Sequence, residues 1–534
     1  MSFTNPNLSP IIKEYLEHYA EITSPKPSSE LIAKIHVDEI ASRIAGFYNN
    51  VRNIIEYREE HLLRKGIIER TLKRYLTLVQ RGQNIAEPFL KEIIRSGHLP
   101  NNAIPEARIK DLQKIIDKYV FLMQRLTLNH VANRQNLKQW LLKNCSCEIE
   151  EKIDPPLKDN LSANLMYQII KSRLVIQGAQ LSEEDKNIEI FINIQKSLLR
   201  ADETQLNYRL LKFLYPSWSD LSSENMLMAA DIIPTLHQKI KKYLKNPLGK
   251  YFSVICNQYN TIFYLIGDIV FTKDKNITDP GAIFDNPELL DKAIKGAYRK
   301  RFEKARSKLG RLAFLSIVSF FLSKIIIALL IEVPLDKYLI HTFSVPNTIV
   351  SILFPPFLMM LIVAAARMPS EKNLKLVIEE SQSVVYQNKA KKYLLRVPPP
   401  KSWFGETSVQ IFYLISFFIS FGLLTLALLS LKFSVASSVI FLFFTSLVAV
   451  TGVKIHNRAR ELSLEQEGAS FSSFLIDIFS MPLVTVGRWA AYGLTKINVL
   501  VLVLDLAIET PFQMFITFLE NLRGFIKHKK EEIY

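Results

Sequence analysis

The spacing of apolar residues changes once along the chain, near residue 311. Before this point, apolar residues recur at steps of three and four, the period of a helix with one buried face, as in residues 40–55, 67–79 and 109–126. After it, residues 312–333, 348–366, 409–431 and 434–453 are almost continuously apolar. Each of these stretches is close to the roughly 20 residues that a membrane helix needs. The pattern predicts an all-α protein with cytoplasmic helical lobes, a four-helix transmembrane bundle and C-terminal amphipathic interfacial helices.

Proline, serine and charge clusters predict the domain boundaries. Residues 1–29 end in a Pro/Ser-rich hinge and are expected to form a flexible N-terminus. A helical lobe is expected over residues 30–143, an acidic, proline-broken linker over 144–160, and a second lobe ending in a basic juxtamembrane helix over 161–311. Residues 312–453 hold the four spans with a loop at 367–408, and residues 454–534 hold the amphipathic helices. Neither lobe shows the alternating pattern of a strand.

The last helix of the second lobe should continue into the first span. Asn286 followed by Pro287 is a typical helix start, with a capping residue before proline in the first turn. This helix is expected to run through Lys292, Lys295 and the basic run that ends at Arg311. The sequence therefore predicts one long helix that leads from the lobe into the membrane.

Lysine and arginine are unevenly distributed among the connections between spans. The connection at residues 334–347 contains only Lys337, and the third connection contains only Lys432, whereas residues 367–408 contain eight basic residues. Basic residues accumulate in cytoplasmic loops. Both termini and the 367–408 loop are therefore predicted to be cytoplasmic, in a multipass protein of the cell membrane. The N-terminus lacks the basic start and apolar run of a signal peptide.

The net charge of +16 has two readings. On a soluble surface it would favour nucleic acid. Here the basic residues lie beside apolar spans, so the expected partner is a lipid bilayer with anionic headgroups. Nucleic acid is not expected to be a partner. The residues assigned to headgroups and topology are Arg299, Lys300, Arg301, Lys304, Arg306, Lys308, Arg311, Lys391, Lys392, Arg488 and Lys496.

Two interpretations remain open for the C-terminal region. Residues 486–506 could form a fifth span, which would place Lys529 and Lys530 outside the cell. Alternatively, this region is an amphipathic helix in the membrane interface, where Trp489 and Tyr492 suit headgroup depth. The positive-inside bias favours the interfacial helix.

Lys324 is the one candidate site residue with a physical argument behind it. It lies near the middle of the first span, where a lysine is costly and normally faces the bundle interior or water. Side chains tilt toward the helix N-terminus, so Lys324 should lean back over Phe320 and Phe321, and Glu332 is too far along the helix for a direct pair. Either Lys324 binds a substrate or ion, or it is a structural lysine bound to carbonyls or lipid phosphate. A functional Lys324 predicts that Lys324→Leu abolishes activity without affecting assembly.

Other polar and helix-breaking residues could complete a site around Lys324. Ser316, Ser319 and Ser323 are predicted to form a polar stripe that faces inward beside it. Pro355 and Pro356 are predicted to kink or interrupt the second span, which would either line a cavity or serve packing.

Motifs of known chemistry are missing from the sequence. It contains no phosphate-binding glycine-lysine loop, dinucleotide fingerprint, His-Glu-x-x-His or Gly-x-Ser-x-Gly. The three cysteines, Cys145, Cys147 and Cys256, suit reduced thiols better than a zinc site or a disulfide framework. We therefore expect no cofactor or metal, and the sequence favours a non-enzymatic protein.

Residues 41–74, 247–259, 319–334 and 487–511 together resemble an uncharacterised family of bacterial multipass membrane proteins with a helical cytoplasmic region. The resemblance implies a bacterial cytoplasmic membrane and no particular activity. The expected function is a membrane-anchored scaffold or interaction protein whose cytoplasmic lobes bind a protein partner. The alternative is a small-solute or ion transporter or channel that uses Lys324 and the Pro355-Pro356 break.

Overall fold

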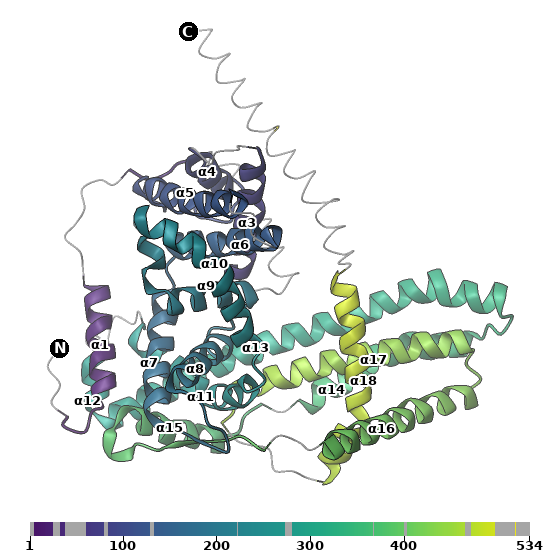
Figure 1. The fold of residues 1–534 in the computed structure, drawn as a ribbon. Helices are drawn as coiled ribbons and strands as arrows, with labels where there is room; N and C mark the ends of the chain where they lie inside the picture. The colour runs from purple at the N-terminus through teal and green to yellow at the C-terminus, as the bar shows by residue number, and fades with distance from the viewer. Residues whose placement is uncertain are drawn as a thin grey trace, which may run out of the picture. The chain divides into compact units, whose positions relative to one another are not determined.

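The computed structural model describes residues 5–24, 33–37, 60–78, 84–128, 133–221, 223–272, 280–366, 368–399, 403–464, 471–496 and 518. Apart from two short strands, the regular structure of these residues is helical, which confirms the predicted all-α class (Figure 1). The chain forms two compact units. The span unit comprises Met1–Leu16, Val175–Ala179 and Gln258–Val499, and the lobe unit is built from Glu17–Leu174 and Gln180–Asn257.

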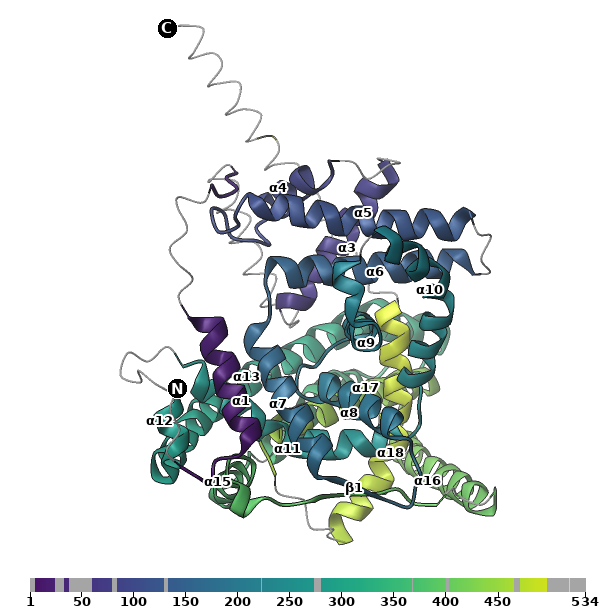
Figure 2. The ribbon, with the colours of Figure 1, turned by 60° about the vertical axis from the view of Figure 1, so that its left-hand side comes forward.

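The lobe unit is a bundle of amphipathic helices around one apolar core. α3 and α5 both pack against α6 (Figures 1 and 2), and the core contains fully buried Phe89, Tyr119 and Trp218. The helices predicted near residues 67–79 and 109–126 are α3 and α5, whereas residues 40–55 lie outside the described residues. The elements of this unit are α3 (Glu60–Leu78), α4 (Ala86–Arg95), α5 (Ala107–Leu128), α6 (Arg134–Ile153), α7 (Leu157–Arg173), α8 (Glu183–Ser197), α9 (Glu203–Leu214), the 3-10 helix η1 (Pro216–Asp220) and α10 (Ser223–Leu244), followed by α11 (Gly249–Val270), which continues into the span unit.

The predicted linker at residues 144–160 is wrong over most of its length. α6 continues to Ile153, and Cys145, Cys147 and Glu148 on it are buried. The chain breaks only at Asp154 and the two prolines that follow, before α7 begins. The acidic residues suggested a solvated segment, but Glu148 is neutralised by a buried lysine instead of by water.

The N-terminus is not a flexible segment where the structure describes it. α1 (Pro10–Thr23) is a helix whose Ile12 and Leu16 are buried. Leu8 before it is also buried, and the Ser9 backbone N–H donates to the carbonyl of Val385 at 2.9 Å. Apolar residues at steps of four give this segment a face that can pack, which the Pro/Ser-rich hinge behind it obscured.

A two-stranded sheet corrects the expectation of no strand. β1 (Leu174–Gln177) pairs with β2 (Tyr393–Arg396), and the Val397 N–H donates to the Gln177 carbonyl at 2.8 Å. The predicted 367–408 loop is therefore partly structured, since it holds β2, α15 (Glu371–Val385) and the 3-10 helix η4 (Gln387–Lys389). Four-residue strands are too short for an alternating pattern to stand out.

Among the residues that the structure describes, the span unit contains four helices that are long and apolar enough to cross a membrane, as predicted. These candidate spans are Pro287–Tyr338, Val345–Ala365, Thr407–Ser430 and Val435–Ala459. The helices that build them, together with their neighbours, are α12 (Pro280–Asp285), α13 (Pro287–Ile327), the π-helical segments η2 (Ala328–Glu332) and η3 (Leu335–Leu339), α14 (Val345–Ala365), α16 (Trp403–Ser430), α17 (Val435–Ala459) and α18 (Phe471–Lys496).

α13 begins as the sequence predicts and runs without a break for 41 residues. The Asn286 side chain accepts a hydrogen bond from the Glu288 N–H at 2.9 Å, and Pro287 occupies the first turn. An asparagine cap satisfies a backbone donor that the first turn leaves open, and proline there sacrifices no hydrogen bond. The basic run and the first candidate span therefore belong to one helix.

α18 lies across α16 and α17 instead of beside them, as both views show (Figures 1 and 2). The crossing is close at Gly487, where an added Cβ would lie 2.0 Å from the Ser446 carbonyl oxygen. The Ser416 hydroxyl also donates to the Ile478 carbonyl at 2.7 Å. α18 is not one of the four candidate spans, and the rest of the 486–506 stretch, beyond Lys496, lies outside the described residues.

Candidate functional site

Lys324 forms a buried ion pair within the first candidate span. Its Nζ atom lies 2.6 Å from Glu332 Oε2, with side-chain exposures of 0% and 1%, and 5.2 Å from the centroid of the Phe444 ring on α17. Two expectations are therefore wrong. Glu332 is close enough for a direct pair, and the Lys324 side chain points toward Glu332 instead of back over Phe320 and Phe321. Glu332 ends the π-helical segment η2, which has a different residue spacing from an α-helix and redirects its side chain.

A second buried carboxylate, Asp336, lies on the next π-helical segment, η3, and fixes that segment to α17. Asp336 accepts hydrogen bonds from the hydroxyls of Ser434 at 2.5 Å and Ser437 at 2.6 Å. Ser434 is also the N-cap of α17 and accepts from the Ser437 N–H at 3.0 Å. A carboxylate at a helix N-terminus is favoured by the helix dipole. Lys324, Glu332 and Asp336 thus tie the end of the first span to α17.

The other residues proposed around Lys324 do not join it. Ser319 and Ser323 are exposed and Ser316 is half-buried, so the predicted inward-facing polar stripe is wrong. Pro355 and Pro356 are buried inside α14, which is helical throughout Val345–Ala365 instead of interrupted. Ser323 precedes Lys324 by about 100° of helix rotation, which turns it out of the packed face.

The basic residues assigned to headgroups and topology differ in their exposure. Arg301 binds both carboxylate oxygens of Asp268, and its guanidinium lies 4.5 Å from the centroid of the Tyr264 ring, so it serves internal packing. Lys391 pairs with Glu380 at 2.5 Å, Lys392 and Arg488 are exposed, and the side chain of Lys496 lies outside the described residues. The other residues of α13 that were assigned to headgroups and topology are exposed: Arg299, Lys300, Lys304, Arg306, Lys308 and Arg311.

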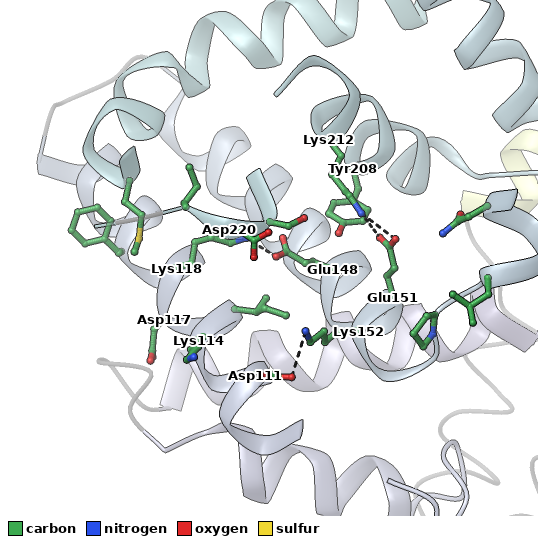
Figure 3. Close-up of a pocket in the computed structure, with 18 residues that line it drawn as sticks. Asp111, Lys114, Asp117, Lys118, Glu148, Glu151, Lys152, Tyr208, Lys212 and Asp220 are labelled. Carbon is green, nitrogen blue, oxygen red and sulfur yellow. Dashed lines mark hydrogen bonds and ion pairs between the residues drawn. The ribbon is translucent and has the colours of Figure 1, made fainter. Parts of the chain in front are cut away.

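The lobe unit contains a cleft of about 1030 Å³ that the sequence did not reveal (Figure 3). Its lining comes from α5, α6, α7, α9, η1 and α10, that is, from residues between 111 and 226. Phe121, Leu221 and Met226 contribute apolar surface. Charged residues of both signs line much of the remainder, as Figure 3 shows.

A fully paired polar network forms part of the cleft wall. Lys118 Nζ donates to Glu148 at 2.5 Å and to the Trp218 carbonyl at 3.0 Å. The Tyr119 hydroxyl donates to the other Glu148 oxygen at 2.8 Å, and the Trp218 indole N–H donates to the Tyr119 oxygen at 3.0 Å. Burial and the Glu148 charge raise the pKa of Tyr119 well above its usual value, so it remains a donor. These bonds give the cleft a fixed shape.

Two further ion pairs lie along the cleft and connect it to smaller hollows. Lys212 pairs with Glu151 at 3.0 Å, and Lys152 pairs with Asp111 at 3.4 Å, as the dashed lines in Figure 3 mark. Glu151 also lines hollows of about 250 Å³ and 340 Å³, so the three spaces adjoin at this residue. In the wall of the 340 Å³ hollow, the ring of Phe191 stacks on that of Phe213, with the ring centroids 4.3 Å apart.

Thiol and metal chemistry find no support in the described residues. Burial raises the pKa of Cys145 and Cys147 well above the usual thiol value, which keeps both protonated at neutral pH and poorly nucleophilic. No group of three or more histidine, cysteine, aspartate or glutamate side chains among these residues is arranged to hold a metal ion.

Glu150, which lines the 250 Å³ hollow, gives the lobe unit a testable pH dependence. Burial raises its pKa from 4.5 to about 7, against the opposing effect of Arg64 and Lys65. The folded state therefore binds a proton more tightly than the unfolded state, so stability should fall as pH rises from about 4.5 to about 7 and then level off. Glu150→Gln should remove this slope, worth about 3 kcal/mol in total, in urea unfolding curves recorded between those pH values. An unchanged slope in the variant would assign the pH dependence to other groups.

The cleft could not be predicted from the sequence because its residues come from separate helices. Lys118 and Glu148 are 30 positions apart and Trp218 is 100 positions from Lys118. One signal was present in the sequence. Glu148 lies next to Cys145, Cys147 and Ile149, residue types that are usually buried, so its charge was unlike that of a solvated residue.

No protein-family model, curated protein or solved structure matches the chain. The function is therefore inferred from the chemistry of the buried ion pair and of the cleft.

Proposed function

We propose that the chain is a multipass membrane-anchored interaction protein, and that the cleft of its lobe unit holds the partner. The cleft is the single observation that supports this function most strongly. At about 1030 Å³ it matches the upper range of binding pockets, and it combines apolar surface with charged groups. Its ion pairs are already formed, so little reorganisation opposes binding.

The membrane segment supports anchoring better than transport. A transport site based on Lys324 needs a cation that can exchange partners, whereas Lys324 is paired with Glu332 and completely buried. The proposed break at Pro355 and Pro356 is a continuous helix. The transporter alternative therefore has weaker support than a structural role for Lys324. The proposal also places both termini in the cytoplasm, which the distribution of basic residues among the connections supports. It places the chain in a bacterial cell membrane, which the family resemblance supports.

Site-specific photocrosslinking in intact cells tests the proposal. A photoreactive benzoylphenylalanine replaces Met226, which lines the cleft, or Met228, which lies on the same helix, is 66% exposed and lies outside the cleft lining. We expect a discrete adduct from the Met226 variant, recovered in the membrane fraction after a carbonate wash, and none from the Met228 variant. Equal labelling at both positions, no adduct at Met226, or loss of the chain from the washed membranes would contradict the proposal.

A further inference from the structure

The 340 Å³ hollow lies where α7, α8 and α9 meet in the lobe unit, and it adjoins the cleft at Glu151. Each of the three helices contributes residues at steps of three and four, so each presents one face to the hollow. Ligand pockets begin at about 300 Å³, and a cavity of about 150 Å³ can hold a benzene ring. The hollow is therefore large enough for an aromatic ring with a short polar tail.

Three aromatic rings form its apolar wall. Phe191 stacks on Phe213, and Tyr167 lies edge-on to both, with ring centroids 6.5 Å and 6.0 Å away. All three side chains line the hollow and are only half-buried. Such a wall favours a flat apolar group, because a further ring can stack on it or meet it edge-on.

Arg209 brings a positive charge to the hollow, and neutral groups hold it in place. Its Nη1 atom donates to the side-chain oxygen of Gln195 at 2.7 Å and to that of Asn160 at 3.4 Å. Gln195 is only 5% exposed, so this hydrogen bond fixes the guanidinium against α8. Within the described part of the chain, no carboxylate forms an ion pair with Arg209, and its Nε and Nη2 donors make no hydrogen bond.

The charged residues that line the hollow leave one net positive charge. Lys212 and Glu151 neutralise each other at 3.0 Å (Figure 3), which leaves the charge of Arg209. On its other side, Arg209 also lines the 250 Å³ hollow, where the acidic side chains are Glu150, Glu151, Asp154 and Asp159. An anion is repelled there, so the aromatic side of Arg209 is the side that suits one.

These acidic residues offset the charge of Arg209 only in part. Asp154 is paired with Arg64 at 2.6 Å. Burial raises the pKa of Glu150 to about 7, so much of this residue is protonated at neutral pH. The guanidinium therefore keeps a positive charge for a ligand in the 340 Å³ hollow.

We propose that the 340 Å³ hollow binds a small aromatic carboxylate. The ring lies against Phe191 and Phe213, and the two carboxylate oxygens accept hydrogen bonds from Nε and Nη2 of Arg209. This fork is the geometry in which arginine binds carboxylates. A single negative charge on the ligand balances the single net charge of the lining. The inference goes beyond the proposed function and does not depend on what the cleft holds.

The test uses the purified full-length chain in mild detergent, with empty micelles as the background. Three probes are titrated by ligand-observed saturation-transfer NMR: 3-phenylpropionate, its neutral amide, and propionate, which has the charge without the ring. Arg209→Gln removes the cation, and Phe213→Leu removes one ring. The matched control is Lys196→Gln, which removes the same charge from an exposed position on α8 outside the lining.

We expect 3-phenylpropionate to bind the unmodified chain and the Lys196→Gln variant with the same dissociation constant. Arg209→Gln should raise this constant about tenfold to a hundredfold, the order expected for hydrogen bonds to a charged group. The weaker binding of the amide should stay unchanged in that variant, because the ring wall is intact. Phe213→Leu should weaken the binding of the acid and the amide alike.

Four outcomes would each overturn the proposal: no saturable binding of 3-phenylpropionate, equal binding of the acid and the amide, equal binding of propionate, or equal losses in the Arg209 and Lys196 variants. Photocrosslinking at Met226 is a separate measurement. The hollow can therefore fail this test while the proposed function of the cleft holds, and the reverse.

Discussion

Replacing Lys118 with methionine should lower the free energy of unfolding of the lobe unit by about 3–5 kcal/mol. The substitution leaves the Glu148 carboxylate, only 5% exposed, with the Tyr119 hydroxyl but without its cation. A buried charge without a counter-ion retains its desolvation cost and loses the attraction that offset it. Urea unfolding of the full chain in detergent, followed by tryptophan fluorescence, measures the loss.

Two further variants separate this effect from a general loss of charge. Lys152→Met removes an ion pair whose side chains are 42% and 40% exposed, and should cost less than about 1 kcal/mol. Lys118→Met/Glu148→Gln removes both charges and should recover much of the lost stability, because a neutral amide can still accept from Tyr119. If Lys118→Met costs no more than Lys152→Met, the network does not stabilise the unit in the way proposed.

The helical core of the fold could be predicted because its signals are local. Asn286 and Pro287 mark the start of α13 with neighbouring residues, and the four candidate spans follow from apolar stretches that are visible within a window of about 20 residues. Both predictions are confirmed. Each of these two predictions needs only residues that are close together in the sequence.

The sites could not be predicted because they depend on contacts between distant residues. Asp336 meets Ser434 nearly 100 positions later, and β1 meets β2 more than 200 positions later. The Lys324–Glu332 ion pair could not be predicted for another reason. Its expected geometry was that of an α-helix, whereas the stretch that ends at Glu332 is π-helical. A π-helical segment has no sequence signature comparable to a cap or a proline.

Lys324→Met should destabilise the span unit by about 3–5 kcal/mol, because Glu332 would remain in an apolar setting without its cation. This expectation differs from that of a substrate-binding lysine, whose replacement would leave assembly intact. Thermal midpoints of the purified full chain, followed by fluorescence-detected size exclusion, measure the change. Lys337→Met is the matched control, since Lys337 is an exposed lysine on the adjacent η3 segment.

The double variant Lys324→Met/Glu332→Gln decides between the structural and the transport roles. Removing both charges of a buried pair is often tolerated, so the double variant should regain most of the stability that Lys324→Met loses, while Lys337→Met stays near the unmodified chain. If the pair is structural, the double variant should also retain the photocrosslink at Met226. A stable Lys324→Met variant would contradict the structural role, because a pair with exposures of 0% and 1% cannot lose one charge without a cost. Ion or solute flux in proteoliposomes that disappears in a stable double variant would instead favour transport through this pair.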